Sequence, residues 1–145
     1  MIKKAVKSII PLEIVTLQEG SYHVFLKVKV NKRMIRVLLD TGASKTVLDQ
    51  NFVKEKCSAQ KMETIDQSTS SLHSTVSESS ITFINEIQIG TSKLKHYLVA
   101  VIDLSHVNQT YEGVGQKPIY GIIGSDILME RKAIIDYHKK QLIIK

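Results

Sequence analysis

The chain has 145 residues, of which 43% are hydrophobic, and carries a formal net charge of +6 at pH 7. This length can build one hydrophobic core but is short for two, so we expect a single domain over residues 1–145. The 20 Lys and Arg residues are dispersed, and only 5 Tyr, 3 Phe and no Trp accompany them. A nucleic-acid-binding protein more often clusters basic and aromatic side chains, so we expect no nucleic-acid partner.

The beginning of the chain and its cysteine content indicate a compartment. The basic residues near the start are not followed by an apolar run long enough for a signal peptide before Pro11. No stretch of the chain is long and apolar enough to cross a membrane. Cys57 is the single cysteine, which excludes an intrachain disulfide and fits a reducing environment. We therefore expect a cytoplasmic protein with no membrane partner.

The first part of the chain favours short strands. Residues 12–16 suggest an early strand that stops before Gly20, and apolar residues alternate with others over 24–30. Asn31 and Lys32 then predict a turn into a second strand over 33–39. The sequence therefore predicts a hairpin that ends at Asp40.

Asp40 opens the tripeptide Asp40-Thr41-Gly42, which directly follows three aliphatic residues. Gly42 permits a sharp turn that would expose the carboxylate at the floor of a cleft. Thr41 and Ser44 add hydroxyl groups beside it. A simple turn stabilised by the Asp side chain is the alternative explanation, so this tripeptide alone is weak support for catalysis.

The middle of the chain contains a short helix, a serine-rich stretch and a hairpin. Asp49 is expected to cap a helix that extends through Lys56, with Phe52 and Val53 turned inward. Residues 67–80 form a low-complexity stretch rich in Ser, consistent with a mobile cover or a disordered loop. Residues 81–89 and 94–102 flank a Gly-containing turn and predict a second hairpin.

The last part of the chain contains an apolar stretch that ends in Gly. Residues 119–123 are followed by Gly124-Ser125-Asp126, and Ser125 or Asp126 is expected to cap a helix to about Lys132. Residues 133–137 and 141–144 predict a final hairpin. Residues 113–118 lack the strand and helix context of a phosphate-binding loop and are expected to form a loop.

Together, the Asp-Thr-Gly-Ala element at Asp40 and the later Gly-Ser-Asp-Ile-Leu element at Gly124 resemble the retropepsin-like aspartic protease family. The two elements occur in the family's order, and the similarity spans most of the chain. This resemblance implies an all-β, closed barrel-like domain with one or two short helices. It also implies a flap over the cleft, for which Ser70, Ser71 and Leu72 are the candidates.

The resemblance further implies an endopeptidase that acts on peptides or proteins. Asp40 would be the catalytic acid, and Thr41 would reach across a dimer axis to the partner's backbone. Gly42 would bind the substrate backbone. Ala43 lacks the hydroxyl that lowers the carboxylate pKa in pepsin-like enzymes, which implies a less extreme acid optimum. Ser44 occupies a position that retroviral enzymes commonly fill with a second Asp.

Two further positions support the site in this resemblance, namely Gly124 and Asp126. The chemistry needs two nearby carboxylates that share one proton, and no other Asp in this chain is followed by Thr/Ser-Gly. The second carboxylate would therefore come from another copy, so we expect a homodimer. The alternative is a catalytically weak or inactive module of the same fold that binds peptides or dimerises.

The sequence contains no pattern that indicates a metal or a cofactor. Its five His residues share no metal-ligand spacing with one another or with Cys57. We therefore expect no metal site and no cofactor.

Overall fold

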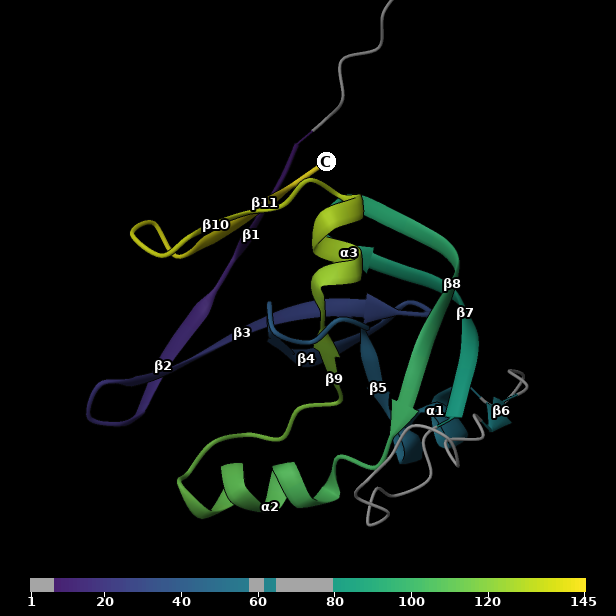
Figure 1. Cartoon of the computed structure of the whole chain (residues 1–145), viewed down its shortest axis with the longest axis horizontal. Coiled ribbons are helices and arrows are strands. Elements are labelled where there is room, and N and C mark those ends of the chain that lie inside the picture. The colour runs from purple at the N-terminus through teal and green to yellow at the C-terminus, as the bar shows by residue number, and fades with distance from the viewer. Residues whose placement is uncertain (1–6, 58–61, 65–79) are drawn as a thin grey trace, which may run out of the picture.

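The computed structural model describes residues 7–57, 62–64 and 80–145, and this part of the chain is mostly β (Figure 1). The strands are β1 (Ser8–Pro11), β2 (Glu13–Gln18), β3 (Ser21–Val30), β4 (Arg33–Leu39), β5 (Val47–Asp49), β6 (Met62–Thr64), β7 (Ser80–Ile89), β8 (Ser92–Ile102), β9 (Gly121–Ile123), β10 (Ile134–Asp136) and β11 (Gln141–Ile144). The helices are α1 (Gln50–Lys56), α2 (Ser105–Gly113) and α3 (Ser125–Glu130). The all-β prediction is confirmed, and α2 is a helix that the sequence analysis did not anticipate.

Six strands close into a barrel. Their order is β3-β4-β9-β5-β8-β7, and β7 returns to pair with β3, so the sheet has no free edge around this ring. β4 runs parallel to β9, with Leu39 opposite Ile123, and β5 runs parallel to β8. β5 and β9 are antiparallel. The predicted barrel-like closure is therefore confirmed.

The β3–β4 hairpin has the predicted turn. Asn31 and Lys32 adopt φ angles of 46° and 69°, the left-handed conformation that a two-residue turn needs to match the twist of its strands. The second predicted hairpin is β7–β8, whose turn contains Gly90 at φ 61°. Each turn sets the register of the strand that follows it. The turn at Asn31 and Lys32 leads into β4, which ends at Leu39.

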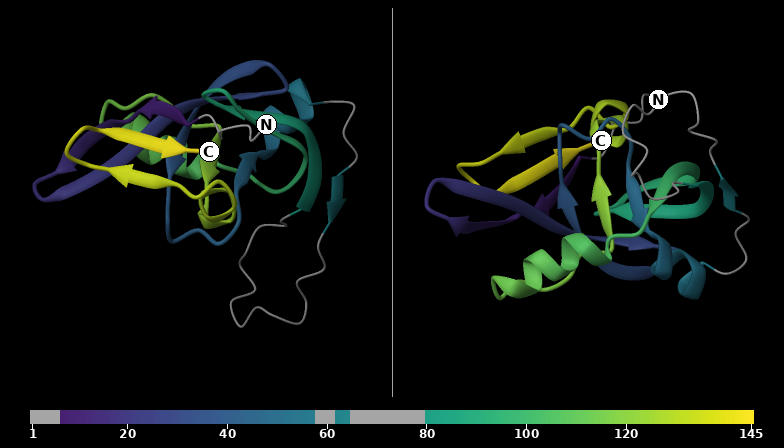
Figure 2. Two further views of the ribbon diagram at one scale, coloured as in Figure 1. Left: turned by 90° about the horizontal axis from the view of Figure 1, so that it is seen from above. Right: turned by 60° about the horizontal axis from the view of Figure 1, so that its bottom comes forward.

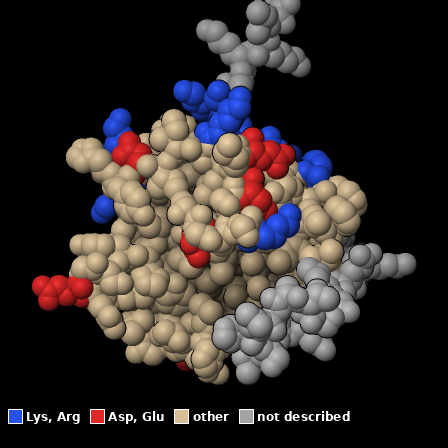
Figure 3. Space-filling model, viewed as in Figure 1, with Lys and Arg blue, Asp and Glu red and all other residues tan. Residues whose placement is uncertain are grey.

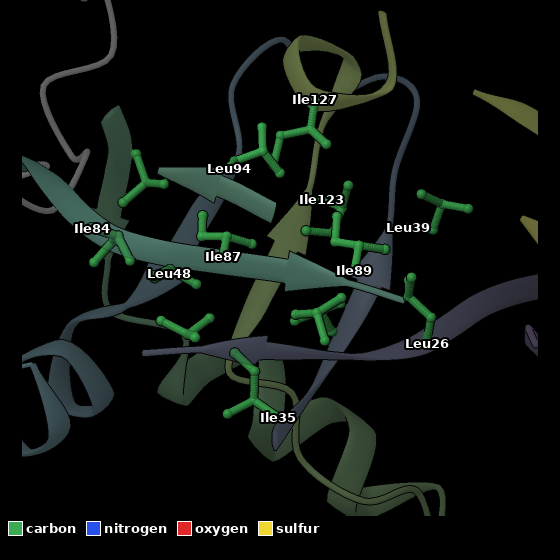
Figure 4. Packing of buried hydrophobic residues seen from close by; sticks show 14 of the residues in the cluster. Leu26, Ile35, Leu39, Leu48, Ile84, Ile87, Ile89, Leu94, Ile123 and Ile127 are labelled. Atoms are coloured by element: carbon green, nitrogen blue, oxygen red, sulfur yellow. The ribbon is translucent and has the colours of Figure 1, made fainter. Parts of the chain in front are cut away.

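The core fills the barrel from several strands at once. Alternate residues of β3 and β4, such as Leu26 and Ile35, point inward because successive side chains of a strand face opposite sides. Figure 4 shows Ile87, Ile123 and Ile127 gathered with them from β7, β9 and α3. Burial of each such side chain stabilises the fold by about 1.5–3 kcal/mol.

A smaller three-stranded sheet, in the order β1-β11-β10, lies beside the barrel. The predicted final hairpin is β10–β11, and β1 adds a strand that the sequence did not indicate. In this sheet Ile9 and Ile134 both align with Ile143, and their side chains are 61% and 56% exposed. In both views of Figure 2 the β10–β11 and β2–β3 hairpins project on the same side of the molecule.

Helix α1 begins as the sequence predicts. One carboxylate oxygen of Asp49 accepts a hydrogen bond of 3.1 Å from the backbone N–H of Phe52, which caps the helix. The other oxygen accepts one of 2.9 Å from the N–H of Leu104. Asp49 is buried, so both bonds compensate for its removal from water.

Candidate active site

The two chain segments singled out by the sequence end side by side. β4 and β9 are parallel, so Asp40 and Gly124 follow Leu39 and Ile123 at the same end of the barrel. The N–H of Asp40 donates a 3.0 Å hydrogen bond to the carbonyl oxygen of Ile123. Backbone contact therefore joins two segments whose key residues, Asp40 and Gly124, lie 84 positions apart in the sequence.

Hydrogen bonds from backbone N–H groups hold the turn that follows Asp40. The N–H of Gly42 donates to Asp40 Oδ1 at 2.9 Å, and the N–H of Ala43 donates to the Asp40 carbonyl at 3.1 Å. The N–H of Ser125 then donates to the Ala43 carbonyl at 2.7 Å. These bonds fix the carboxylate relative to both segments, because each bond restricts a different part of the turn.

Gly124 is required where the two segments cross. A Cβ atom at this position would lie 2.7 Å from the Ala43 carbonyl oxygen and 2.9 Å from the Lys45 carbonyl carbon. Both neighbours are backbone atoms and cannot move aside as a side chain could. The loop after Asp40 can therefore approach β9 this closely only at a glycine.

Asp126 lies in the first turn of α3 but does not cap it. The capping residue is Gly124, which has no side chain to bond the helix start, and α3 ends at Glu130 instead of about Lys132. The prediction that Ser125 or Asp126 caps this helix is wrong. The Asp126 carboxylate instead accepts hydrogen bonds from Thr46 Oγ1 at 2.8 Å and from the Tyr97 hydroxyl at 3.0 Å.

The charge state of this network follows from its contacts. Burial works against ionisation of Asp126, but hydrogen bonds from Thr46, from the backbone of Ile127 and from Tyr97 hold its pKa below the ordinary value. Lys45 Nζ adds an ion pair at 3.7 Å. Burial and the bond to Asp126 raise the pKa of the Tyr97 hydroxyl, so it remains a donor. The network joins β8 and the loop after Asp40 to α3.

Asp40 itself is half-buried and lines an open cleft of about 310 Å³, here called the Asp40 cleft. Its other lining residues come from β3, the end of β4 and the β10–β11 hairpin: Tyr22, His23, Val24, Leu38, Leu39, Thr41, Ile135 and Tyr137. Thr41 is exposed beside the acid. Tyr22 and Tyr137 are 63% and 62% exposed, so two aromatic side chains flank the carboxylate in contact with solvent.

The remaining predicted site residues are distributed as follows. Ala43 is half-buried, and Ser44 is exposed on the same loop. Ser70, Ser71 and Leu72, proposed for the flap, lie outside the described residues. Asp103 and Asp136 accept hydrogen bonds from the backbone N–H groups of Ser105 and Lys139, and neither lines the Asp40 cleft.

Sequence reasoning missed the side chains that come from other elements. His23, Tyr22 and Tyr137 line the cleft, and they belong to the β2–β3 and β10–β11 hairpins, which project on the same side of the molecule (Figures 1 and 2). No local pattern marks them, since their role depends on how distant strands pair. Among the described residues, no cluster of three or more His, Cys, Asp or Glu could hold a metal ion. Within the same ranges, no helix could span a membrane.

Comparison with known proteins agrees with this geometry. Residues 26–127 match a family model described as aspartyl protease, a range that includes both Asp40 and Asp126. A retropepsin-like aspartic protease from Rickettsia conorii superposes with a TM-score of 0.57 at 20% identity, covering 99% of this chain and 96% of that chain. No curated protein matches the chain in sequence.

Two further solved structures share the fold. The retroviral protease-like domain of Ddi1 from Leishmania major has a TM-score of 0.53 at 14% identity, covering 83% of this chain and 86% of that chain. The EIAV protease in complex with the inhibitor HBY-793 has a TM-score of 0.51 at 20% identity, covering 80% and 93%. The expected retropepsin-like fold is therefore confirmed.

Proposed function

This chain belongs to the aspartyl protease family and has the retropepsin-like fold, and from this premise we propose that it is an endopeptidase whose active form is a homodimer. The observation that carries the proposal is the position of Asp40. Its carboxylate is half-buried on an open cleft, and backbone bonds hold it between two crossing chain segments. No other Asp or Glu among the described residues lines this cleft.

A single carboxylate is insufficient for the proposed reaction. Two carboxylates within a few ångströms cannot both ionise, so the pair holds one proton and supplies one base and one acid. The base takes a proton from a water molecule, whose oxygen attacks the scissile carbonyl carbon. The acid donates its proton to the carbonyl oxygen, and the leaving nitrogen is protonated as the C–N bond breaks. The second carboxylate comes from Asp40 of another copy.

The surroundings of Asp40 support this assembly. A two-fold axis that brings two Asp40 side chains together must pass beside the Asp40 cleft. Exposed groups that flank this cleft would therefore meet the second copy. Thr41 is exposed there, as the proposed contact between the two turns requires. Among the described strands β10 pairs only with β11, so no described strand covers its other edge, which is where we place contact with the second copy.

The neighbouring residues have proposed roles that follow the family pattern. Gly42 offers its backbone to the substrate, and Gly124 and Asp126 support the turn. Ala43 places no hydroxyl beside the dyad, so we expect an acidic to near-neutral pH optimum. Ser44 gives a neutral substrate contact in place of a second carboxylate.

The test is cleavage of unstructured peptides by the wild type and by Asp40→Asn. The substitution retains the acceptor for the Gly42 N–H but destroys the shared-proton pair, so activity should fall by at least about 10²–10⁴-fold with little change in stability. Asp103→Asn, at an exposed acid outside the cleft, is the matched control and should remain active. Undiminished cleavage by pure, folded Asp40→Asn would refute the assignment. Peptide binding without cleavage by the wild type would instead favour a binding module.

A further inference from the structure

His23 on β3 forms a wall between two cavities. One is the Asp40 cleft, and the other is a cavity of about 410 Å³ between the β2–β3 hairpin and α2. This second cavity, here called the hairpin–helix pocket, is lined by Leu17, Gln18, Ser21, His23, His106, Val107, Thr110, Tyr111 and Val114. A side chain that lines both cavities makes them neighbours on one surface.

The wall between the two cavities is rigidly built. The Nδ1 atom of His23 lies 2.9 Å from the Tyr111 hydroxyl, and Tyr111 is only 4% exposed. The Tyr111 ring packs edge-on against both His23 and Phe25, with ring centroids 5.6 and 5.3 Å apart. A buried hydroxyl with a hydrogen-bond partner and packed rings holds α2 at a fixed distance from β3.

The chain after α2 is also attached to the barrel. The Arg36 guanidinium lies 3.8 Å above the Phe25 ring, donates to the Lys117 carbonyl at 2.7 Å and contacts Gln116 Oε1 at 3.1 Å. Asn108 of α2 makes two bonds with the backbone of Ile119, at 2.9 and 2.8 Å. The helix that forms one side of the pocket is therefore held at Asn108 and by the segment that follows it, so the pocket does not depend on a ligand to form.

The lining of the pocket includes polar residues such as Gln18, Ser21 and His106, but most of its exposed surface is apolar. Leu17 and Val107 are half-buried, and Val114 is 49% exposed, so apolar surface remains in contact with solvent. Figure 3 shows that the surface over α2 and the β2–β3 hairpin is largely uncharged on this face. Such a cavity favours an apolar side chain over a charged one.

The pocket is also electrostatically close to the acid. Burial raises the pKa of Tyr111, Arg36 opposes this effect, and the negative charge of Asp40 acts in the same direction as burial. The hydroxyl that fixes the wall therefore lies within the field of the carboxylate. His23 also lines the Asp40 cleft, so a peptide bound there would lie beside the wall of the pocket.

We propose that the hairpin–helix pocket is a specificity subsite that takes a bulky aliphatic or aromatic side chain of the same peptide, at a position removed from the scissile bond. This inference rests on the proposed function. The occupant is a substrate side chain because the pocket is preformed, presents mainly apolar surface and shares His23 with the Asp40 cleft. Full burial of such a side chain favours its peptide by about 10- to 100-fold in kcat/KM over the Ala-containing equivalent.

The test fills the pocket from α2. Thr110 lines the pocket and is exposed, so Thr110→Trp should occupy it without disturbing the core. Gln109→Trp, at the neighbouring exposed position outside the pocket lining, is the matched control. A peptide library varied at every position around the cleavage site is profiled with each protein, and thermal melting confirms that each is folded.

The wild type and Gln109→Trp should prefer bulky apolar residues at one remote position by about 10- to 100-fold. Thr110→Trp should lose that preference while retaining the preferences next to the scissile bond. Cleavage with the same profile in Thr110→Trp and wild type would overturn the subsite and leave the protease assignment intact.

Binding of the same peptides to Asp40→Asn, measured by fluorescence anisotropy, separates the two hypotheses. If the wild type cleaves nothing, but binding to Asp40→Asn shows a preference that the added Thr110→Trp removes, the subsite stands and the protease assignment fails. Absence of both cleavage and binding would overturn both.

Discussion

The Thr46 hydroxyl donates a 2.8 Å hydrogen bond to Asp126 Oδ1 and accepts a 3.1 Å bond from the N–H of Gly124. Thr46 is fully buried, so this hydroxyl has no access to water. It connects the loop after Asp40 with both the end of β9 and the first turn of α3. The position of Asp40 therefore depends on a residue six positions further along the chain.

Thr46→Val should destabilise the protein. Valine has nearly the same shape but leaves a buried N–H at Gly124 unpaired and removes a donor to Asp126. The expected loss is about 1–3 kcal/mol in the free energy of unfolding, measured in urea. Thr46→Ser retains the hydroxyl and should recover most of this loss. Equal stability of the Val and Ser variants would mean that the hydroxyl contributes packing alone.

The Asp126 network should make stability depend on pH. The pKa of Asp126 is lowered in the folded state, so its contribution is present above the unfolded pKa of about 3.9 and lost as pH falls through the lower folded value. Unfolding of wild type and Asp126→Asn in urea should therefore differ at pH 6 and converge as the pH falls below 4. A difference that is constant across this range would contradict the assigned hydrogen bonds.

The role of Asp126 also shows where sequence reasoning ended. A polar residue after Gly124 correctly indicated a helix start, because such residues often cap helices. The structure assigns its carboxylate to Thr46 and Tyr97, which are 80 and 29 residues away in the chain. Local patterns contain no information on such distant pairs. The sequence did predict the turn at Asn31 and Lys32 and the cap at Asp49, because both depend on residues that are close together in the chain.

Helix α2 was missed for a related reason. Its sequence has few apolar residues and good helix formers are scarce, so intrinsic propensity does not favour a helix. The helix is held by contacts from elsewhere, namely Tyr111 to His23 and Asn108 to Ile119. The sequence located Asp40 and Gly124 because motif residues lie close to them, but it could not identify a cavity wall that forms only when α2 packs on β3.

Gly124→Ala should destabilise the fold more than an ordinary glycine substitution. The added Cβ would lie 2.7 Å from the Ala43 carbonyl oxygen, which forces the loop after Asp40 away from β9. We expect a loss of about 1–3 kcal/mol, detected by thermal melting, together with reduced cleavage. Gly113→Ala is the control, because nothing lies within 4 Å of a Cβ there and its φ is not positive. Similar melting temperatures for both variants would contradict the close crossing.

The proposed dimer predicts that association is sensitive to substitutions at the edge of β10 that no described strand covers. Ile134 lies on this strand and is 56% exposed, and the same hairpin brings Ile135 and Tyr137 to the Asp40 cleft. A second copy that completes the dyad would cover this edge. A charge introduced on this strand would be present in both copies, so the interface should lose apolar burial at two places.

Ile134→Lys should make catalysis depend more steeply on protein concentration. If each copy loses about 1.4 kcal/mol of apolar burial, the two losses together weaken the dimer Kd about 100-fold. Activity per chain and molecular mass are measured on the same dilution series, and both should shift to higher concentration together because only the dimer contains two carboxylates. Met34→Lys is the matched control, since Met34 is also 56% exposed but lies near the opposite end of β4 from Asp40. An equal shift in both variants would place the interface elsewhere, and cleavage by a proven monomer would refute the shared dyad.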